Sequence, residues 1–411
     1  MNDQIANRPS VRIVSVPAAR RGAGGENTPR FWGMTARQRL ERAVARAEIQ
    51  AAAAPPGPGL LLIRDDFVLD EMLLPALLRQ PGSVLVTSVG AVPVAVHLVG
   101  PPATERVAAV EAALRAGRID DGAMGGLRRL DPVGLATTYN HGLRKREAPY
   151  LLQSGAEPTG ATERRMFNGA YKGVTDFVTK RVWPWPAFHV TRLCARLGIA
   201  PNLVTAVSLI LVVLAFWLFW RGDFALGLAA AWGMCFLDTV DGKLARVTLN
   251  SSSFGNVFDH GIDLIHPPFW YYAWYRGLIA TNPPELGGGA EGAILAALIL
   301  ILLGYVGGRL QEGAFQVLYG IQIHTWRPID SWFREITARR NPNLFILTLA
   351  VILGNPRDGF LAVAAWTAIS FAFHMVRILQ AALATAIGRA PVSWLTEPMF
   401  PEPMHPLSRP S

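Results

Sequence analysis

Four aspartates lie in an otherwise apolar part of the chain, between residues 236 and 270. Asp238 and Asp241 are three residues apart, and Asp259 and Asp263 are four apart. At these spacings the two members of each pair share one face of a helix. A carboxylate at the centre of a membrane helix costs about 2.5–3.5 kcal/mol, so four of them require compensation.

Divalent cations are the compensation that these residue types favour. Carboxylates that converge in one cleft repel one another unless cations lie between them, and an all-aspartate set suits hard ions such as Mg²⁺ or Mn²⁺ rather than zinc. Neutralisation by basic side chains explains the pattern less well. Only Lys243 and Arg246 are close in the sequence, so at least two carboxylates would stay unpaired.

The polar segment "VTLNSSS" separates the two aspartate pairs. Asn250 suits a turn, and the serines at 251–253 are able to cap a following helix. We therefore expect two helices that form a hairpin, with both pairs facing each other. Small residues one turn away from the aspartates, such as Gly242 and Gly255, leave room for a ligand to approach the backbone.

Long apolar runs predict the elements that carry these residues. Spanning a bilayer takes about 20 mostly apolar residues, and the second half of the chain has six runs that reach or approach this length. We predict an α-helical integral membrane protein with six transmembrane helices, preceded by a small soluble α/β domain. The runs are Leu203–Trp220, Phe224–Leu237, Ile262–Ala280, Ala293–Gly307, Leu344–Leu353 and Phe360–Ile387.

The distribution of basic residues predicts the orientation. Lys and Arg are frequent before Leu203 and in the loop 324–343, and they are rare in the loops 221–223, 281–292 and 354–359. Because positive residues accumulate in short cytoplasmic loops, we expect the aspartates and both termini on the cytoplasmic side of the inner membrane. The net charge of +9 then suits contact with anionic lipids, and nucleic acid is not expected as a partner.

The first half of the chain predicts a small α/β unit. The segment from Thr35, a suitable N-cap, to the Pro55–Pro56 stop is helical in pattern, and "GLLLIR" (59–64) is typical of a buried strand. A helix at 69–80, strands at 83–88 and 93–100 and a helix at 103–117 complete it. Asp65 and Asp66 follow the first strand, where α/β sheets often bind ligands, but solvated turn carboxylates are the preferred interpretation.

Together these patterns divide the chain into five regions. They are a disordered tail (1–30), the soluble α/β domain (31–150), a linker with an amphipathic juxtamembrane helix (151–200), the six-helix domain (201–388) and a cytoplasmic tail (389–411).

The spacing of the aspartates and their neighbours resembles the signature of the CDP-alcohol phosphotransferases, D-x2-D-G-x2-A-R-x8-G-x3-D-x3-D. Every fixed position is present, as Asp238, Asp241, Gly242, Ala245, Arg246, Gly255, Asp259 and Asp263. Eight fixed positions match by chance about once in 10^10 trials, so the motif is specific. The resemblance covers about residues 168–388, and "PNLVT" (201–205) is similar to the start of the family's first helix.

This resemblance implies transfer of a substituted phosphate from a CDP-linked donor to the hydroxyl of an alcohol, with release of CMP. It implies two Mg²⁺ or Mn²⁺ ions held by Asp238, Asp241, Asp259 and Asp263, with Asp263 also acting as the general base. Residues at the matching positions would accept the cytidine diphosphate: Asn202, Thr205, Gly242, Ala245, Arg246 and Gly255. Members of the family tend to be homodimers, and some carry a fused sugar-nucleotidyltransferase domain.

Three points stay open in the sequence. Arg334, Arg339 and Arg340 suit a phosphorylated polyol acceptor, but they also follow the general excess of positive charge in cytoplasmic loops. The α/β domain resembles a degenerate nucleotidyltransferase that lacks the glycine-rich loop, so we expect it to be inactive. A divalent cation transporter and an inactive nucleotide-binding scaffold are the competing functions.

Overall fold

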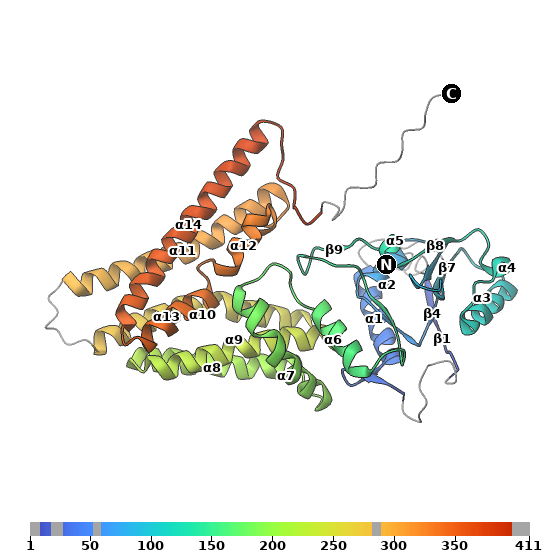
Figure 1. Cartoon of the computed structure of the whole chain (residues 1–411), viewed down its shortest axis with the longest axis horizontal. Helices are drawn as coiled ribbons and strands as arrows, with labels where there is room; N and C mark the ends of the chain where they lie inside the picture. The colour runs from blue at the N-terminus through green and yellow to red at the C-terminus, as the bar shows by residue number, and fades with distance from the viewer. Residues whose placement is uncertain (1–8, 18–27, 52–58, 282–288, 397–411) are drawn as a thin grey trace, which may run out of the picture.

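The computed structural model describes residues 9–17, 28–51, 59–281 and 289–396. A small α/β domain lies at one end of the molecule and long helices make up the other end (Figure 1). This arrangement follows the change in composition along the chain, from mixed polar and apolar segments to long apolar runs.

A five-stranded mixed sheet forms the centre of the α/β domain, in the order β1-β4-β7-β6-β8. β1 is parallel to β4 and β6 is parallel to β8, whereas β7 is antiparallel to both of its neighbours. The strands are β1 (Ser10–Val14), β4 (Gly59–Arg64), β6 (Ser83–Val86), β7 (Pro93–Val99) and β8 (Arg128–Leu130).

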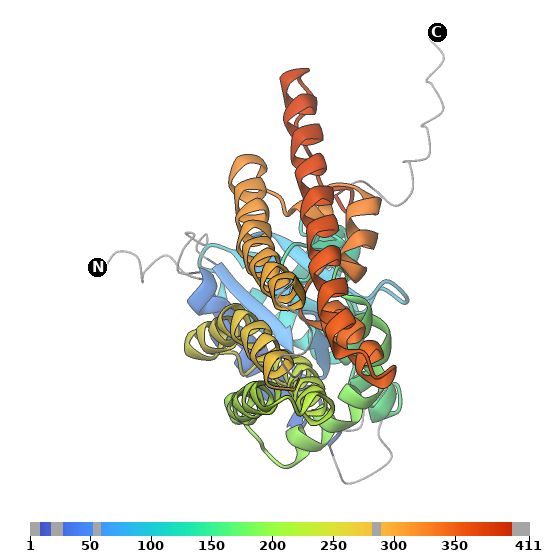
Figure 2. The same ribbon diagram turned by 90° about the vertical axis from the view of Figure 1, so that its left-hand side faces the viewer.

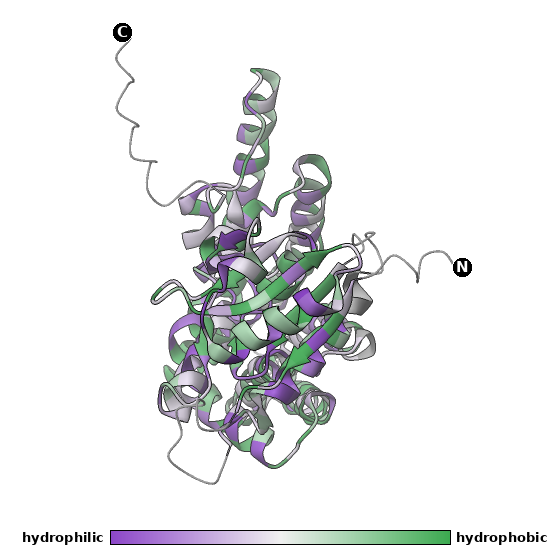
Figure 3. Ribbon diagram, turned by 90° about the vertical axis from the view of Figure 1, so that its right-hand side faces the viewer, coloured by the Kyte–Doolittle hydropathy of each residue, from purple (hydrophilic) through white to green (hydrophobic). Residues whose placement is uncertain are grey.

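Helices cover both faces of this sheet. Alternate residues of β4 point to opposite faces: Leu61 and Ile63 pack with helices α1 and α2, whereas Leu60 and Leu62 pack with α3 and α4. Figure 3 shows the strands as mainly hydrophobic, as expected for a sheet buried on both faces. The helices are α1 (Ala36–Ala51), α2 (Leu73–Leu78), α3 (Thr104–Ala116), α4 (Asp121–Met124) and α5 (Pro132–Leu135).

The sequence predicted most of these elements. β4 has the expected bounds, and Thr35 caps α1 in a reciprocal pair of hydrogen bonds with Gln38, of 3.2 and 3.0 Å. The helix predicted at 69–80 is shorter in the structure, where α2 spans Leu73–Leu78. The prediction of a disordered tail over residues 1–30 is wrong for residues 10–14, which form β1 at the edge of the sheet.

The interpretation of Asp65 and Asp66 as solvated turn residues was also wrong. Both are almost completely buried. Asp66 forms an ion pair of 2.7 Å with Arg64, and Asp65 accepts a hydrogen bond of 3.0 Å from the backbone of Val16. Each carboxylate therefore has a structural partner within the domain, so neither is a free ligand.

Three small antiparallel pairs and three helical segments connect the sheet to the long helices. The pairs are β2 (Arg30–Phe31) with β3 (Met34–Thr35), β5 (Phe67–Leu69) with β11 (Leu151–Gln153), and β9 (Tyr139–Asn140) with β10 (Lys145–Arg146). The helical segments are α6 (Thr159–Gly169), the π-helix η2 (Val178–Val182) and α7 (Pro184–Arg196).

Six long or medium helices follow at the positions of the six predicted apolar runs. They are α8 (Pro201–Arg221), α9 (Phe224–Val247), α10 (Ser253–Thr281), α11 (Gly289–Tyr319), α13 (Arg340–Ile352) and α14 (Pro356–Ala386). The short segments η3 (Ile323–Thr325) and α12 (Pro328–Ile336) lie between α11 and α13. Prolines at the first turn of α8 and α14 favour these starts, because the missing N–H has no partner there in any helix.

Four of these helices are long and apolar enough to cross a membrane: α8, α9, residues Glu291–Tyr319 of α11, and α14. Large apolar side chains on α8 such as Ile210 and Val213 are exposed, as expected for a surface that faces lipid. The protein is therefore an integral membrane protein with a helical membrane domain. The six-span prediction is confirmed only for these four.

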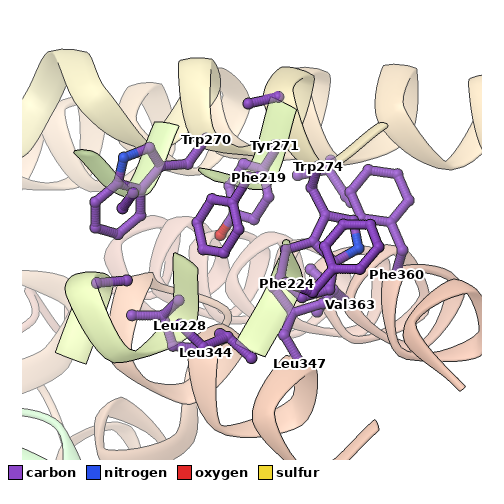
Figure 4. Packing of buried hydrophobic residues seen from close by; sticks show 14 of the residues in the cluster. Phe219, Phe224, Leu228, Trp270, Tyr271, Trp274, Leu344, Leu347, Phe360 and Val363 are labelled. Carbon is purple, nitrogen blue, oxygen red and sulfur yellow. The ribbon is translucent and has the colours of Figure 1, made fainter. Parts of the chain in front are cut away.

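Aromatic side chains hold the membrane helices together. Phe219 of α8, Phe224 of α9, Trp274 of α10 and Phe360 of α14 lie in one buried cluster (Figure 4). Gly277 of α10 is required at this crossing, because a Cβ there would lie 2.1 Å from the carbonyl oxygen of Phe219.

The two longest helices, α11 and α14, lie side by side beside this cluster (Figure 2). Gln311 of α11 donates a hydrogen bond of 3.2 Å to the carbonyl oxygen of Phe371 in α14, which links the pair within the bundle.

Candidate active site

The aspartates lie where α9 and α10 meet. α9 continues ten residues past the apolar run and ends at Val247, so Asp238 and Asp241 are in its last turns. A short turn follows, with Leu249 in the left-handed region at φ 51°. α10 then begins at Ser253, which puts Asp259 and Asp263 near its start.

Three of the four aspartates come together as a cluster. Asp238, Asp241 and Asp259 each offer a carboxylate oxygen, and these oxygens lie within 4.8 Å of one another. Thr205 of α8 orients Asp241 by donating a hydrogen bond of 2.6 Å to its Oδ2. The other oxygen of Asp241 is buried and has no hydrogen-bond partner among the described residues. Such an unpaired carboxylate oxygen fits a divalent cation, which we expect these three residues to hold.

Asp263 lies outside this cluster and shares a basic partner with Asp238. Arg340, at the start of α13, bridges Asp238, at 2.5 Å, and Asp263. The sequence did not identify Arg340 as the counter-ion of Asp238 and Asp263, but two carboxylates stay without a basic partner as expected: among the described residues Asp241 and Asp259 form no ion pair with Lys or Arg. Lys243 is not the cation that pairs with them: its ammonium donates to the carbonyl oxygen of Ala170 and lies 3.5 Å from the ring centre of Tyr171. The sequence could not show this, because Arg340 is 77 residues from Asp263.

One cavity of about 1270 Å³ contains the aspartates and opens between the α/β domain and the membrane helices. Every residue that the sequence predicted for the site lines it: Asn202, Thr205, Asp238, Asp241, Gly242, Ala245, Arg246, Gly255, Asp259, Asp263, Arg334, Arg339 and Arg340. Residues from five separate elements thus share one space.

The two signature glycines leave little room for a side chain. A Cβ on Gly255 would lie 2.5 Å from the side-chain oxygen of Asn202, and one on Gly242 would lie 3.2 Å from the guanidinium of Arg246. The first contact brings α10 close to α8 beside the aspartate cluster, and the second lies within α9. The guanidinium of Arg246 interacts electrostatically with Glu71 of the α/β domain and with Asp241 and Asp259 of the cluster.

A basic region occupies another side of the cavity. Arg334 is almost completely buried in α12, and two of its side-chain nitrogens have no hydrogen-bond partner within the described ranges. Burial and the neighbouring charge of Arg339 lower the pKa of Arg334 to about 9. Arg339 itself is paired with Glu312 of α11. Arg340 lies apart from these two, with the aspartates.

Arg144 and Lys172 are among the basic residues that line the same cavity and that the sequence missed. Burial and the charges of Arg144 and Arg246 lower the pKa of Lys172 to about 8. Lys172 lies in a basic and aromatic segment that predicts contact with lipid headgroups, and Arg144 lies in the run "RKR" that suggested no role. Their function depends on tertiary contacts that the spacing does not encode.

Comparison with known proteins identifies the central part of the chain. The sequence model of the CDP-alcohol phosphatidyltransferase family matches residues 198–308, from the start of α8 to the middle of α11. The archaetidylinositol phosphate synthase of Pyrococcus horikoshii is 37% identical over 79 residues, which are 19% of this chain and 42% of that protein. The chain thus covers less than half of the length of this relative. Residues 198–308, which hold the aspartate cluster, are therefore a CDP-alcohol phosphatidyltransferase domain.

Proposed function

We propose that the protein is a metal-dependent membrane transferase. It moves a substituted phosphate from a CDP-linked donor to the hydroxyl of an alcohol and releases CMP. The observation that carries this proposal is the convergence of Asp238, Asp241 and Asp259 in a cavity that also contains the remaining signature residues. The family match at 198–308 supports the same reaction class.

The aspartate cluster would hold Mg²⁺ or Mn²⁺, with two ions proposed. When bound there, such ions would neutralise the diphosphate and stabilise the entering and leaving oxygens of an in-line displacement. The protein's own residues do the rest. Arg246 and the close-packed glycines receive the diphosphate end of the CDP group, and Thr205 fixes the orientation of Asp241.

Asp263 is the proposed general base. Its carboxylate takes the proton from the acceptor hydroxyl while that oxygen forms a bond to phosphorus, and the bond from phosphorus to the CMP oxygen breaks. The pairing with Arg340 fixes the carboxylate at the edge of the aspartate cluster. Arg340 therefore serves the reacting centre rather than the distal end of the acceptor.

The acceptor is proposed to carry a phosphate of its own. Arg334 offers buried donors without hydrogen-bond partners among the described residues, and Arg144 and Arg339 lie in the same part of the cavity. Guanidinium groups bind phosphate oxygens strongly. A phosphorylated polyol such as an inositol phosphate fits this chemistry. The name of the relative, archaetidylinositol phosphate synthase, contains the same inositol phosphate group.

We also propose that α10 and α13 cross the membrane, which would give six crossing helices with the cavity and both termini on the cytoplasmic side. A homodimer is expected from the family. α13 is short, since 13 residues rise only about 20 Å, but it begins with Arg340 at the cavity and continues into the aromatic core through Leu344 and Leu347.

A divalent cation transporter explains the carboxylates but not the signature residues around them. A pathway also needs polar groups through the depth of the membrane, whereas the aspartate cluster is confined to the neighbouring ends of α9 and α10. An inactive nucleotide-binding scaffold would not require Asp263.

The test is a CMP-release assay on purified protein in detergent. CDP-linked lipid, Mn²⁺ and candidate alcohols, including inositol phosphate, are expected to release CMP only when all three are present. Asp263→Asn should lower kcat by about 10²–10⁴-fold and leave CMP binding intact. Binding of CMP by a wild-type protein that never releases it would favour the scaffold, and Mn²⁺ flux into vesicles without CMP release would favour the transporter.

A further inference from the structure

The first helix of the α/β domain presents a row of arginines to the membrane domain. Arg39, Arg42 and Arg46 of α1 are three and four residues apart, which places them on one face. Arg39 is buried and donates a hydrogen bond from Nη1 to the carbonyl oxygen of Val247. Arg42 donates one of 3.0 Å to the carbonyl oxygen of Thr248. These carbonyls at the end of α9 lack partners within the helix, and positive charge is favourable there.

A second contact fixes the same relationship. The turn between β2 and β3 inserts Trp32 into a buried cluster that contains Val240 and Leu244 of α9. The backbone N–H of Trp32 donates a hydrogen bond of 2.9 Å to the carboxylate of Glu163, which also forms an ion pair of 2.7 Å with Arg192 of α7. The α/β domain is therefore docked on the helix that carries half of the signature, and its polar surface forms one wall of the cavity.

Two side chains on this wall, Glu71 and Arg46, form a loose ion pair with each other and line the cavity. Strand β5 pairs with β11, and the pairing ends with a hydrogen bond of 2.9 Å between the backbones of Asp70 and Tyr150. Glu71 follows immediately and lines the cavity. Arg46 lines it as well, with its Nη1 3.7 Å from the Glu71 carboxylate, which is too long for a hydrogen bond.

Within the described residues the buried Nη1 of Arg46 has no hydrogen-bond partner. The carboxylate of Glu71 is half-exposed to the cavity. The two side chains thus offer one acceptor group and one donor group at neighbouring positions. Arg246 lines the same cavity and interacts electrostatically with Glu71 as well as with the aspartates.

We propose that Arg46 and Glu71 form the subsite for the nucleobase of the donor, so that the α/β domain supplies base recognition to the transferase. This inference rests on the proposed function. Cytosine has an amino group that donates hydrogen bonds and, beside it, a ring nitrogen and an oxygen that accept them. Glu71 would accept from the amino group, as carboxylates do from cytosine in other complexes, and Arg46 would donate to the acceptors.

The order of groups along the cavity agrees with the order in a CDP-linked donor. The diphosphate would lie at the aspartate cluster, the segment next to it at Arg246, and the base at Glu71 and Arg46. Uracil has a carbonyl oxygen in place of the amino group. It would face the Glu71 carboxylate with an acceptor, so the subsite would reject it.

The test compares the binding of CMP and UMP to the full-length protein in detergent with Mn²⁺, by calorimetry. The wild type should bind CMP more tightly than UMP. In Glu71→Gln the preference for CMP should fall about tenfold or more, because the amide can also donate to the uracil oxygen. Arg46→Gln should weaken both nucleotides. Glu41→Gln is the matched control, since Glu41 lies in an exposed ion pair with Arg37 and does not line the cavity.

A structural role alone would weaken CMP and UMP by the same factor, and a preference for CMP that persists in Glu71→Gln overturns the subsite. Failure of the proposed function has a different signature, because the wild type would then bind neither nucleotide or release no CMP. A wild type that binds and releases CMP, together with an unchanged preference in Glu71→Gln, rejects the base subsite only.

Discussion

Thr205 on α8 donates a hydrogen bond of 2.6 Å to Oδ2 of Asp241 on α9, and both side chains are buried. The remaining oxygen of Asp241 is buried and has no hydrogen-bond partner among the described residues. A residue outside the ligand set thus fixes which oxygen is free for a cation.

Replacing Thr205 by valine should weaken metal binding without unfolding the protein. Valine has the same shape but leaves Oδ2 of Asp241 without its donor, and loss of such an orienting partner typically lowers metal affinity about 10–100-fold. The Mn²⁺ concentration needed for half-maximal CMP release should rise accordingly. Thr367→Val is the control, because Thr367 donates only within α14 and does not line the cavity. An unchanged Mn²⁺ requirement in Thr205→Val would show that this hydrogen bond does not position a ligand.

Gly255→Ala should impair activity far more than Gly261→Ala, although both glycines are in α10. The added methyl group at 255 would lie 2.5 Å from the side chain of Asn202, whereas nothing lies within 4 Å of a Cβ at 261. The first substitution must displace Asn202 or separate α8 from α10, and the second should stabilise the helix by up to about 1 kcal/mol. The measurements are kcat and KM for the CDP-linked donor and the thermal midpoint. Equal effects of the two substitutions would contradict the close contact.

Local sequence features predicted much of this structure. The apolar runs between polar turns located the long helices, although α8 begins at Pro201 and α14 at Pro356, two and four residues before the predicted runs. The 3 and 4 spacings of the aspartates located the cluster, because residues at these separations share a helix face. The predicted site residues then met in one cavity, since they occupy the ends of neighbouring helices.

Contacts between distant segments could not be predicted from local sequence features. Arg39 reaches the carbonyl oxygen of Val247 across 208 residues, and a backbone acceptor leaves no mark in residue identity. The bridge from Arg340 to Asp238 depends on how α13 enters the bundle. Strand β1 was missed because "SVRIV" is short and follows a polar segment, while its partner β4 begins almost 50 residues later.

Arg340→Gln should destabilise the metal-free protein. Arg340 is the cation between Asp238 and Asp263, and its loss leaves two partly buried carboxylates close together. Loss of hydrogen bonds to charged groups costs about 1.5–3 kcal/mol. Mn²⁺ should restore part of this stability, because the ion supplies positive charge to the same carboxylates. The measurement is the thermal midpoint with EDTA and with Mn²⁺.

The control for Arg340→Gln is Arg276→Gln. Arg276 lies on another part of α10, contacts the ring of Trp220 of α8 and does not line the cavity. Its small effect should be the same with and without Mn²⁺. If Mn²⁺ did not reduce the difference in thermal midpoint between Arg340→Gln and the wild type, Arg340 would not act as the counter-ion of the aspartates.

Asp176→Asn should reduce stability in a pH-dependent manner. Burial raises the pKa of the Asp176 carboxyl, but the charge of Arg334 and hydrogen bonds from Thr179 and Asn341 outweigh it and hold the pKa below its usual value of 3.8. A carboxyl whose pKa is depressed by folding stabilises the protein above its unfolded pKa and loses this contribution as the pH falls through the folded pKa. The wild type should therefore exceed the variant by roughly 1–3 kcal/mol above pH ~5, and the difference should shrink below pH ~4. Unfolding in detergent from pH 3 to 7 measures this difference. The control is Asp223→Asn, in the half-exposed pair with Arg221, which should lower the free energy of unfolding by less than about 1 kcal/mol. If the stability difference between the wild type and Asp176→Asn stayed constant down to pH 3, the charged carboxylate would not be the source of that difference.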